Sequence, residues 1–95
     1  TINRTPAPTD YELRGNYPNP FNPATTISFS LPVSGEVRFT IFDLQGKVVR
    51  TIKTGEMQAG RHNITFDGRA LTSGIYFYRM QAGGFVATRK MLLVK

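Results

Sequence analysis

The side chains that most often carry out catalysis are scarce in this chain of 95 residues. It has one histidine, His62, and no cysteine. A histidine acts as a general base in nucleophilic catalysis only when a nucleophile and an orienting group lie in contact with it. His62 alternates with Ile64 and Phe66 in the segment HNITF, which is the pattern of one face of a β-strand. We therefore interpret His62 as a core or strand-edge residue.

The carboxylates show no spacing that suits hydrolysis or metal binding. They are Asp10, Glu12, Glu36, Asp43, Glu56 and Asp67. Glycoside hydrolysis requires two carboxylates about 5–10 Å apart across a cleft, and Asp43 and Asp67 stand in turn sequences, where aspartate supports the backbone. No D-x-D-x-D-G calcium loop is present, although a calcium ion held weakly by loop oxygens stays an open alternative. We predict a domain that is not an enzyme and has no cofactor or metal site.

The charge of the chain is basic, and its cations are dispersed. Twelve lysines and arginines against six acids give a net charge of +6, which suits a polyanionic or acidic partner. The cations run from Arg4 to Lys95 without a block of five, and no nucleic-acid-binding motif accompanies them. We expect a basic surface and no nucleic-acid partner.

The two ends of the chain differ in composition. Residues 1–10, TINRTPAPTD, are rich in threonine and proline and are predicted to be a linker, followed by one domain over residues 11–95. No signal peptide begins at Thr1, so we expect a mature protein or a fragment of a longer one. The longest apolar run is residues 91–94, whereas a membrane-spanning helix needs about 20 residues. We expect a chain that does not span a membrane.

Alternation of apolar and polar residues predicts strand after strand from residue 11 onward. The segments TTISFSL and EVRFTIFD place one apolar set toward the core: Ile27, Phe29, Leu31, Val37, Phe39 and Ile41. The residues between them are predicted to face outward: Thr26, Ser28, Ser30, Arg38 and Thr40. In KVVRTIK the inward face is ambiguous, because Val48 and Ile52 compete with Val49 for the core.

Turn sequences connect these strands. Residues 43–46, DLQG, read as a type I turn with a left-handed glycine, and Gly83-Gly84 is a two-residue hairpin signal. Pairing about the second turn sets three pairs opposite each other: Tyr76 with Met91, Met80 with Ala87, and Ala82 with Phe85. Arg89 then falls on the core side, and we predict a β-bulge near it that re-aims the last residues.

The number and spacing of the strands define the fold class. About seven short strands with turns every 8–12 residues and no significant helix predict an all-β, immunoglobulin-like antiparallel β-sandwich. Residues 16–32, NYPNPFNPATTISFSLP, hold three asparagines and four prolines. We predict that residues 18–23 form a stiff connector outside the sheet ladders, because proline lacks a backbone donor, and that Tyr17 and Phe21 plug the end of the sandwich.

Exposed aromatic rings support an alternative function. Sandwich-type carbohydrate-binding modules hold sugars on flat exposed rings, and an accessory module of a polysaccharide-degrading enzyme is therefore a second hypothesis. Its candidate contact residues are Tyr17, Phe21, Phe42 and Phe77. A purely structural spacer is a third hypothesis.

Four segments in order carry a resemblance to a known family. They are YPNPFNPATTISFSLP at 17–32, IFDLQGKVVRTI at 41–52, GRHNITFDGRALTSGIYFYRMQAG at 60–83 and the terminal KMLLVK. Together they resemble the C-terminal sorting domain of type IX secretion cargo in Bacteroidetes and related phyla, over about 85 residues from residue 11 onward. The Asp-x-x-Gly turn and Ser-Gly-x-Tyr also resemble the flagellar hook-capping immunoglobulin-like domain. Phe66 stands where many members place tryptophan.

The resemblance implies a non-catalytic secretion, sorting and cell-surface anchoring domain of a larger extracellular enzyme, such as a glycoside hydrolase or peptidase. It implies export across the outer membrane, recognition by the type IX translocon, cleavage within or before residues 1–10 by a sortase-like peptidase, and attachment of the upstream catalytic domain to anionic lipopolysaccharide. Carried onto this chain, the implied recognition residues are Gly74, Tyr76, Lys90, Met91, Leu92, Leu93, Val94 and Lys95.

Overall fold

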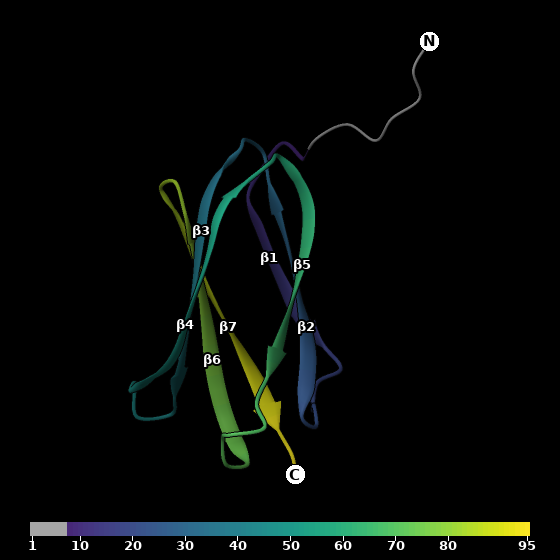
Figure 1. Cartoon of the computed structure of the whole chain (residues 1–95), viewed down its shortest axis with the longest axis vertical. Coiled ribbons are helices and arrows are strands. Elements are labelled where there is room, and N and C mark those ends of the chain that lie inside the picture. Colours follow the sequence, from purple (N-terminus) through teal and green to yellow (C-terminus); the bar gives the residue numbers. More distant parts are fainter. Residues whose placement is uncertain (1–7) are drawn as a thin grey trace.

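The computed structural model describes residues 8–95, and the predicted linker lies mostly outside them, in residues 1–7. Seven strands follow one another along the chain: β1 (Glu12–Tyr17), β2 (Ala24–Leu31), β3 (Gly35–Asp43), β4 (Val48–Met57), β5 (Gly60–Asp67), β6 (Gly74–Ala82) and β7 (Phe85–Leu93). They form two antiparallel sheets, with strand orders β1-β2-β5 and β4-β3-β6-β7. The sheets face each other in the elongated sandwich of Figure 1. The predicted fold class is confirmed, and β4 joins the β3–β6–β7 sheet as the C′ strand does in immunoglobulin-like domains.

The apolar side chains that alternate along the strands fill the space between the sheets. The six residues predicted to face inward on β2 and β3 are all buried, and Phe29 meets Phe39 across the sandwich with ring centroids 5.0 Å apart. Some predicted outward residues are buried too, since Ser30 and Thr40 are nearly inaccessible. The core therefore follows the period-two pattern, but long neighbouring side chains also cover short polar ones.

A β-bulge resolves the ambiguity of β4. Ile41 of β3 pairs with Arg50, whereas the next residue, Phe42, pairs with Val48, so Val49 is the extra residue. As a result Val49 and Ile52 both pack against the core, and Val48 is exposed. The bulge also turns Arg50 toward the sandwich end.

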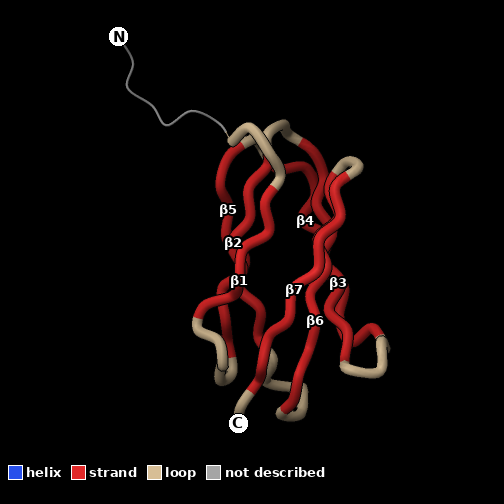
Figure 2. The backbone as a smooth tube through the Cα atoms, turned by 180° about the vertical axis from the view of Figure 1, so that it is seen from behind, coloured by secondary structure: helices blue, strands red, loops and turns tan. Residues whose placement is uncertain are grey.

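The β6–β7 hairpin has the predicted register, but its predicted bulge is wrong. Pairing is continuous from Gly74–Leu93 to Ala82–Phe85, and Tyr78 lies opposite Arg89. Arg89 keeps its core-side register because β7 is an edge strand. From this position Arg89 Nε donates a hydrogen bond to Leu13 O of β1 at 2.6 Å. Figure 2 shows β1 and β7 as neighbours across the open side of the sandwich.

Both predicted turns are present. Gly46 has φ 87° and its N–H donates to Asp43 O, as the type I turn with a left-handed glycine requires. Gly83 has φ 56°, and Tyr11 covers this turn by stacking on Phe85 at 5.2 Å. The two hairpins therefore fix the four-stranded sheet and place β7 at its edge.

Candidate functional site: the terminal strand and the Asn-Pro segment

The end of β7 is bonded to a segment more than 70 residues away in sequence. We call residues 16–23 the Asn-Pro segment; in it the peptide bonds before Pro18, Pro20 and Pro23 are cis. Phe21 forms a parallel bridge with Leu93, in which Phe21 N–H donates to Leu92 O at 2.9 Å and Val94 N–H donates to Phe21 O at 3.0 Å. Residues 18–23 belong to no strand, as predicted, but the isolated bridge at Phe21 was not predicted. Phe21 pairs because it is a non-proline residue with its own donor.

The remaining backbone donors at this strand end also have partners. Asn19 Oδ1 accepts a hydrogen bond from Leu92 N–H at 3.0 Å, and Ser73 Oγ accepts one from Lys95 N–H at 3.0 Å. The Lys95 ammonium donates to Arg69 O at 2.6 Å. The end of the chain is thus held by two loops, residues 16–23 on one side and residues 68–73 on the other. Figure 1 shows the C-terminus at the end of the sandwich where these loops lie.

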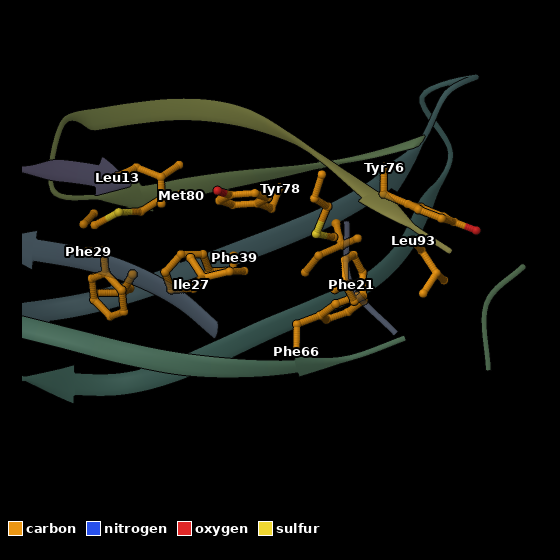
Figure 3. Packing of buried hydrophobic residues seen from close by; sticks show 14 of the residues in the cluster. Leu13, Phe21, Ile27, Phe29, Phe39, Phe66, Tyr76, Tyr78, Met80 and Leu93 are labelled. Atoms are coloured by element: carbon orange, nitrogen blue, oxygen red, sulfur yellow. The ribbon is translucent and has the colours of Figure 1, made fainter. Parts of the chain in front are cut away.

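Phe21 anchors the Asn-Pro segment in the core. Its side chain is 1% exposed, and its ring meets the Phe66 ring edge-on with centroids 6.1 Å apart. In Figure 3 Phe21 lies beside Phe66 and Leu93. A Cβ atom on Gly68 would come within 3.2 Å of Phe21 and 3.3 Å of Leu93, so a methyl group here would require these side chains to shift by a few tenths of an ångström. Phe21 plugs the sandwich as predicted.

Asn16 and Thr25 fix the start of the same segment. Asn16 Nδ2 donates to Thr25 Oγ1 at 3.1 Å and to Pro18 O at 3.2 Å, and Thr25 Oγ1 donates to Pro18 O at 2.8 Å. Both side chains are buried. These bonds satisfy a carbonyl that lies among prolines, which have no donors of their own. The predicted role of Tyr17 as a second plug is wrong, because its side chain is 82% exposed.

The residues that the resemblance marks for recognition fall into two groups. Tyr76, Met91 and Leu93 are buried in the core, and Gly74 begins β6 with φ 155°. The other group is open to solvent: Lys90, Leu92 (37% exposed), Val94 (47% exposed) and Lys95. Because successive side chains of a strand point to opposite faces, the terminal strand presents one accessible side and one core side.

The four candidate sugar-contact rings do not form one platform. Phe21 is buried and Tyr17 projects alone from the end of β1. Phe42 and Phe77 stack on the outer face of the other sheet, with ring centroids 5.7 Å apart. A sugar cannot reach Phe21 without opening the core, so these aromatics give the carbohydrate-binding alternative no support.

His62 and three of the carboxylates, Glu12, Asp43 and Asp67, have structural partners. His62 Nε2 donates to Gln58 O at 2.7 Å, and its ring lies 5.6 Å from that of Phe29. Asp43 Oδ1 accepts hydrogen bonds from the backbone of Gln45 and Lys47. Within residues 8–95 no three histidine, cysteine or acidic residues gather as metal ligands.

Within residues 8–95, burial raises the pKa of one titratable group. The Tyr78 hydroxyl donates to Arg14 O at 2.8 Å across the two sheets, and desolvation raises the pKa of Tyr78 above its ordinary value of 10.0. The positive charge of Arg89 opposes this rise. Tyr78 is thus a neutral cross-sheet tie at physiological pH rather than a proton donor to a substrate.

The described residues therefore define a β-sandwich whose most elaborate feature is a fastened terminal strand. Such a domain belongs to the class of recognition modules, in which surfaces and strand edges carry function. Over residues 8–95 there is no helix of the length and apolarity that a membrane span requires.

Comparison with known proteins identifies the family. The profile of the secretion system C-terminal sorting domain matches residues 16–95. The chain belongs to this family, and it is a non-catalytic sorting domain of the type IX secretion system, which exports its cargo across the outer membrane to the medium or the cell surface. No curated protein and no solved structure matches the chain. The family assignment favours sorting over carbohydrate binding.

Sequence reasoning missed the partners that fasten β7. Asn19 and Ser73 supply side-chain oxygens to the last backbone donors, and Asn16 organises the segment from within. A signal for Asn19 is present in hindsight: an asparagine between two prolines can accept a hydrogen bond where the flanking backbone offers no donors.

Proposed function

We propose that the secretion machinery reads the accessible side of the terminal strand, formed by Lys90, Leu92 and Val94, together with Lys95 beyond the end of β7. Gly74, Tyr76, Met91 and Leu93 shape this strand from the core side. The observation that carries the proposal is the fastening of the strand end by Asn19 and Phe21. A fastened strand presents its exposed side chains in one conformation, which lowers the ordering cost of recognition.

The fastening also restricts how a partner can bind. Leu92 N–H and Val94 N–H are already occupied, so a partner cannot pair with this strand end by β-augmentation unless it displaces the Asn-Pro segment. In the described residues no further strand pairs with residues 86–90 of β7 through backbone hydrogen bonds, although β1 lies beside them and Leu13 O accepts a hydrogen bond from Arg89. We propose recognition of side chains at residues 90–95, with main-chain pairing confined to the part of β7 that precedes them.

An export assay tests this proposal. Residues 1–95 are fused to a reporter in a host with a type IX system, and the exported fraction is measured for Leu92→Asp/Val94→Asp. Val33→Asp is the matched control, because Val33 is a similarly exposed apolar residue in the loop before β3. The double variant is expected to retain the reporter in the periplasm, as does deletion of residues 90–95, while Val33→Asp is exported. Equal export of all variants would refute recognition at the terminal strand.

We further propose that residues 1–10 are the linker and that residues 11–95 are the domain. Packing of Tyr11 against the core, with its ring stacked on Phe85, supports a domain that starts at residue 11. On this proposal the upstream cargo is an extracellular enzyme, a sortase-like peptidase cuts within or before residues 1–10, and the cargo is joined to anionic lipopolysaccharide. Mass spectrometry of the released domain tests the cut: an N-terminus beyond residue 11 would contradict it.

A further inference from the structure

The outer faces of the two sheets differ in character. Within residues 8–95, six of the eight exposed large apolar side chains lie on the four-stranded sheet, its β3–β4 turn or the residue after β7: Leu44, Val48, Ile75, Val86, Leu92 and Val94. By contrast, the outer face of the β1–β2–β5 sheet is polar at its centre, where Ser28 Oγ donates to Asn63 Oδ1 at 2.7 Å. One sheet therefore carries an apolar face that the domain itself leaves uncovered.

A row that includes two aromatic residues crosses this apolar face near the β3–β4 turn. The register places Val48, Phe42, Phe77 and Lys90 side by side on the four strands β4, β3, β6 and β7. The Phe42 and Phe77 rings stack with an interplanar angle of 22°, and both stay half-buried. Rings that are already stacked and half-buried lose little conformational freedom when a partner binds. Such rings are therefore suited to anchor a protein interface.

Cations lie beside the row, at Arg79, and four residues from Phe42 along β3, at Arg38. Arg79 Cζ lies 5.6 Å from the Phe42 ring centroid, and Arg79 Nε is buried without a hydrogen-bond partner in residues 8–95. Arg38 and Lys53 face each other on the neighbouring strands β3 and β4. The ion pairs of the described residues lie elsewhere, at Arg14–Glu12 and Arg69–Asp67. We call Phe42, Phe77, Val48, Arg38 and Arg79 the aromatic-basic face.

The carboxylates nearest to the aromatic-basic face stand at its margins. Glu36 and Glu56 pair at the end of the sheet near the Gly83 turn, and Asp43 is engaged in its own turn. The centre of the face is therefore positive and apolar at once. A second copy of the chain would bring like charges together, so self-association through this face is disfavoured.

We propose that the aromatic-basic face is a docking surface for an acidic protein surface in which carboxylates flank an aromatic or apolar side chain. Carboxylates would pair with Arg38 and Arg79, and the apolar group would cover Phe42 and Phe77. This inference rests on the proposed function in that the secretion machinery reads the folded domain, but it adds a second contact surface apart from the terminal strand.

A protein partner fits the geometry better than an anionic membrane. Membrane-surface binding buries projecting apolar groups about 5–10 Å deep, whereas Phe42 and Phe77 are half-buried and stack on each other across neighbouring strands. A face with half-buried rings is covered more completely by a complementary protein surface. The expected partner of this face is therefore a protein and not a membrane.

Binding of the whole chain to defined probes tests the chemistry. The probes are a copolymer of glutamate and tyrosine, and vesicles that contain phosphatidylglycerol. Phe42→Thr/Phe77→Thr and Arg38→Glu/Arg79→Glu are each expected to weaken copolymer binding at least tenfold, on the order of 1.4 kcal/mol. The control Arg14→Glu/Arg61→Glu carries the same two charge reversals on the other sheet and is expected to change binding less than about twofold.

Three outcomes overturn the proposal. In the first, all variants bind the copolymer as tightly as the unchanged chain does. In the second, the control variant loses as much copolymer binding as the face variants do. In the third, the chain does not bind the copolymer, and the face variants lose binding to the vesicles. Thermal unfolding of each variant checks that the fold is intact, and a face variant that does not fold is replaced by Phe77→Thr alone.

Export of the reporter fusion separates this proposal from the preceding one. If the face variants reduce export about tenfold and the Arg14→Glu/Arg61→Glu control does not, the docking surface is supported. If Leu92→Asp/Val94→Asp blocks export while the face variants are exported normally, the docking surface is refuted and the terminal-strand proposal stands. If only the face variants reduce export, the terminal-strand proposal fails.

Discussion

Replacement of Phe21 by alanine tests the fastening of the terminal strand most severely. Phe21 is 1% exposed and packs on Phe66 and Leu93, and buried Phe→Ala substitutions cost about 3–5 kcal/mol. A domain of 95 residues has a free energy of unfolding of roughly 5–14 kcal/mol, from about 0.05–0.15 kcal/mol per residue. Phe21→Ala should therefore remove a large share of the stability of the domain.

Two further variants of the same segment calibrate this prediction. Asn19→Ala removes the acceptor of Leu92 N–H and should cost about 1 kcal/mol. Tyr17→Ala changes a side chain that is 82% exposed and should cost less than about 0.5 kcal/mol.

Urea unfolding at 25 °C measures all three variants. With a slope of about 2 kcal/mol/M, Phe21→Ala should lower the midpoint by roughly 2 M and Asn19→Ala by roughly 0.5 M. Hydrogen exchange should show a roughly fivefold faster Leu92 amide in Asn19→Ala. A loss below about 1 kcal/mol for Phe21→Ala, or an equal loss for Tyr17→Ala, would refute the assignment of Phe21 as the anchor.

Three other predictions concern the sandwich itself. Burial raises the pKa of the Tyr78 hydroxyl, so this hydroxyl loses its proton at a lower pH in the unfolded chain than in the folded domain. The contribution of the neutral hydroxyl to the free energy of unfolding is complete below about pH 10, and it is lost as the pH rises through the folded-state pKa. Tyr78→Phe should therefore flatten the decline of the free energy of unfolding above about pH 10, and an unchanged slope would contradict this. Gly83→Ala should cost about 1–2 kcal/mol of stability, because φ of Gly83 is +56° and the added Cβ would lie 2.7 Å from the Tyr11 hydroxyl. Gly84→Ala should cost less than about 0.5 kcal/mol. Equal melting temperatures of the two variants in calorimetry would contradict this account of the turn. Arg89→Met removes the hydrogen bond to β1 and should cost about 1 kcal/mol in urea unfolding, and no loss would mean that this bond contributes nothing.

The strand pattern was predictable because one face of each strand is buried. A slip of one residue would turn Phe39 and Ile41 out of the core, so alternation predicted which side chains of β3 face inward. The Gly83-Gly84 turn predicted the register of the β6–β7 hairpin. The bulge at Val49 was not predictable in the same way. Two adjacent valines and an arginine satisfy either face until the partner strand is known.

The fastening of the terminal strand depended on contacts that sequence periodicity does not report. Phe21 and Leu93 are neighbours only because the sandwich brings the loop after β1 next to the end of β7. Likewise, Arg89 broke the predicted pattern because its partner, Leu13 O, lies on another strand across the open side of the sandwich. Long-range pairs of this kind have no signature in local spacing.

Site-specific photo-cross-linking in a type IX-competent host tests most directly where the machinery contacts the domain. A photoreactive residue replaces Leu92 on the accessible side of the terminal strand, or Thr65 on the outer face of the β1–β2–β5 sheet. We predict that position 92 cross-links to an outer-membrane component of the secretion machinery during export and that position 65 does not. Normal export with no cross-link from position 92, or an equally strong cross-link from position 65, would contradict recognition at the terminal strand.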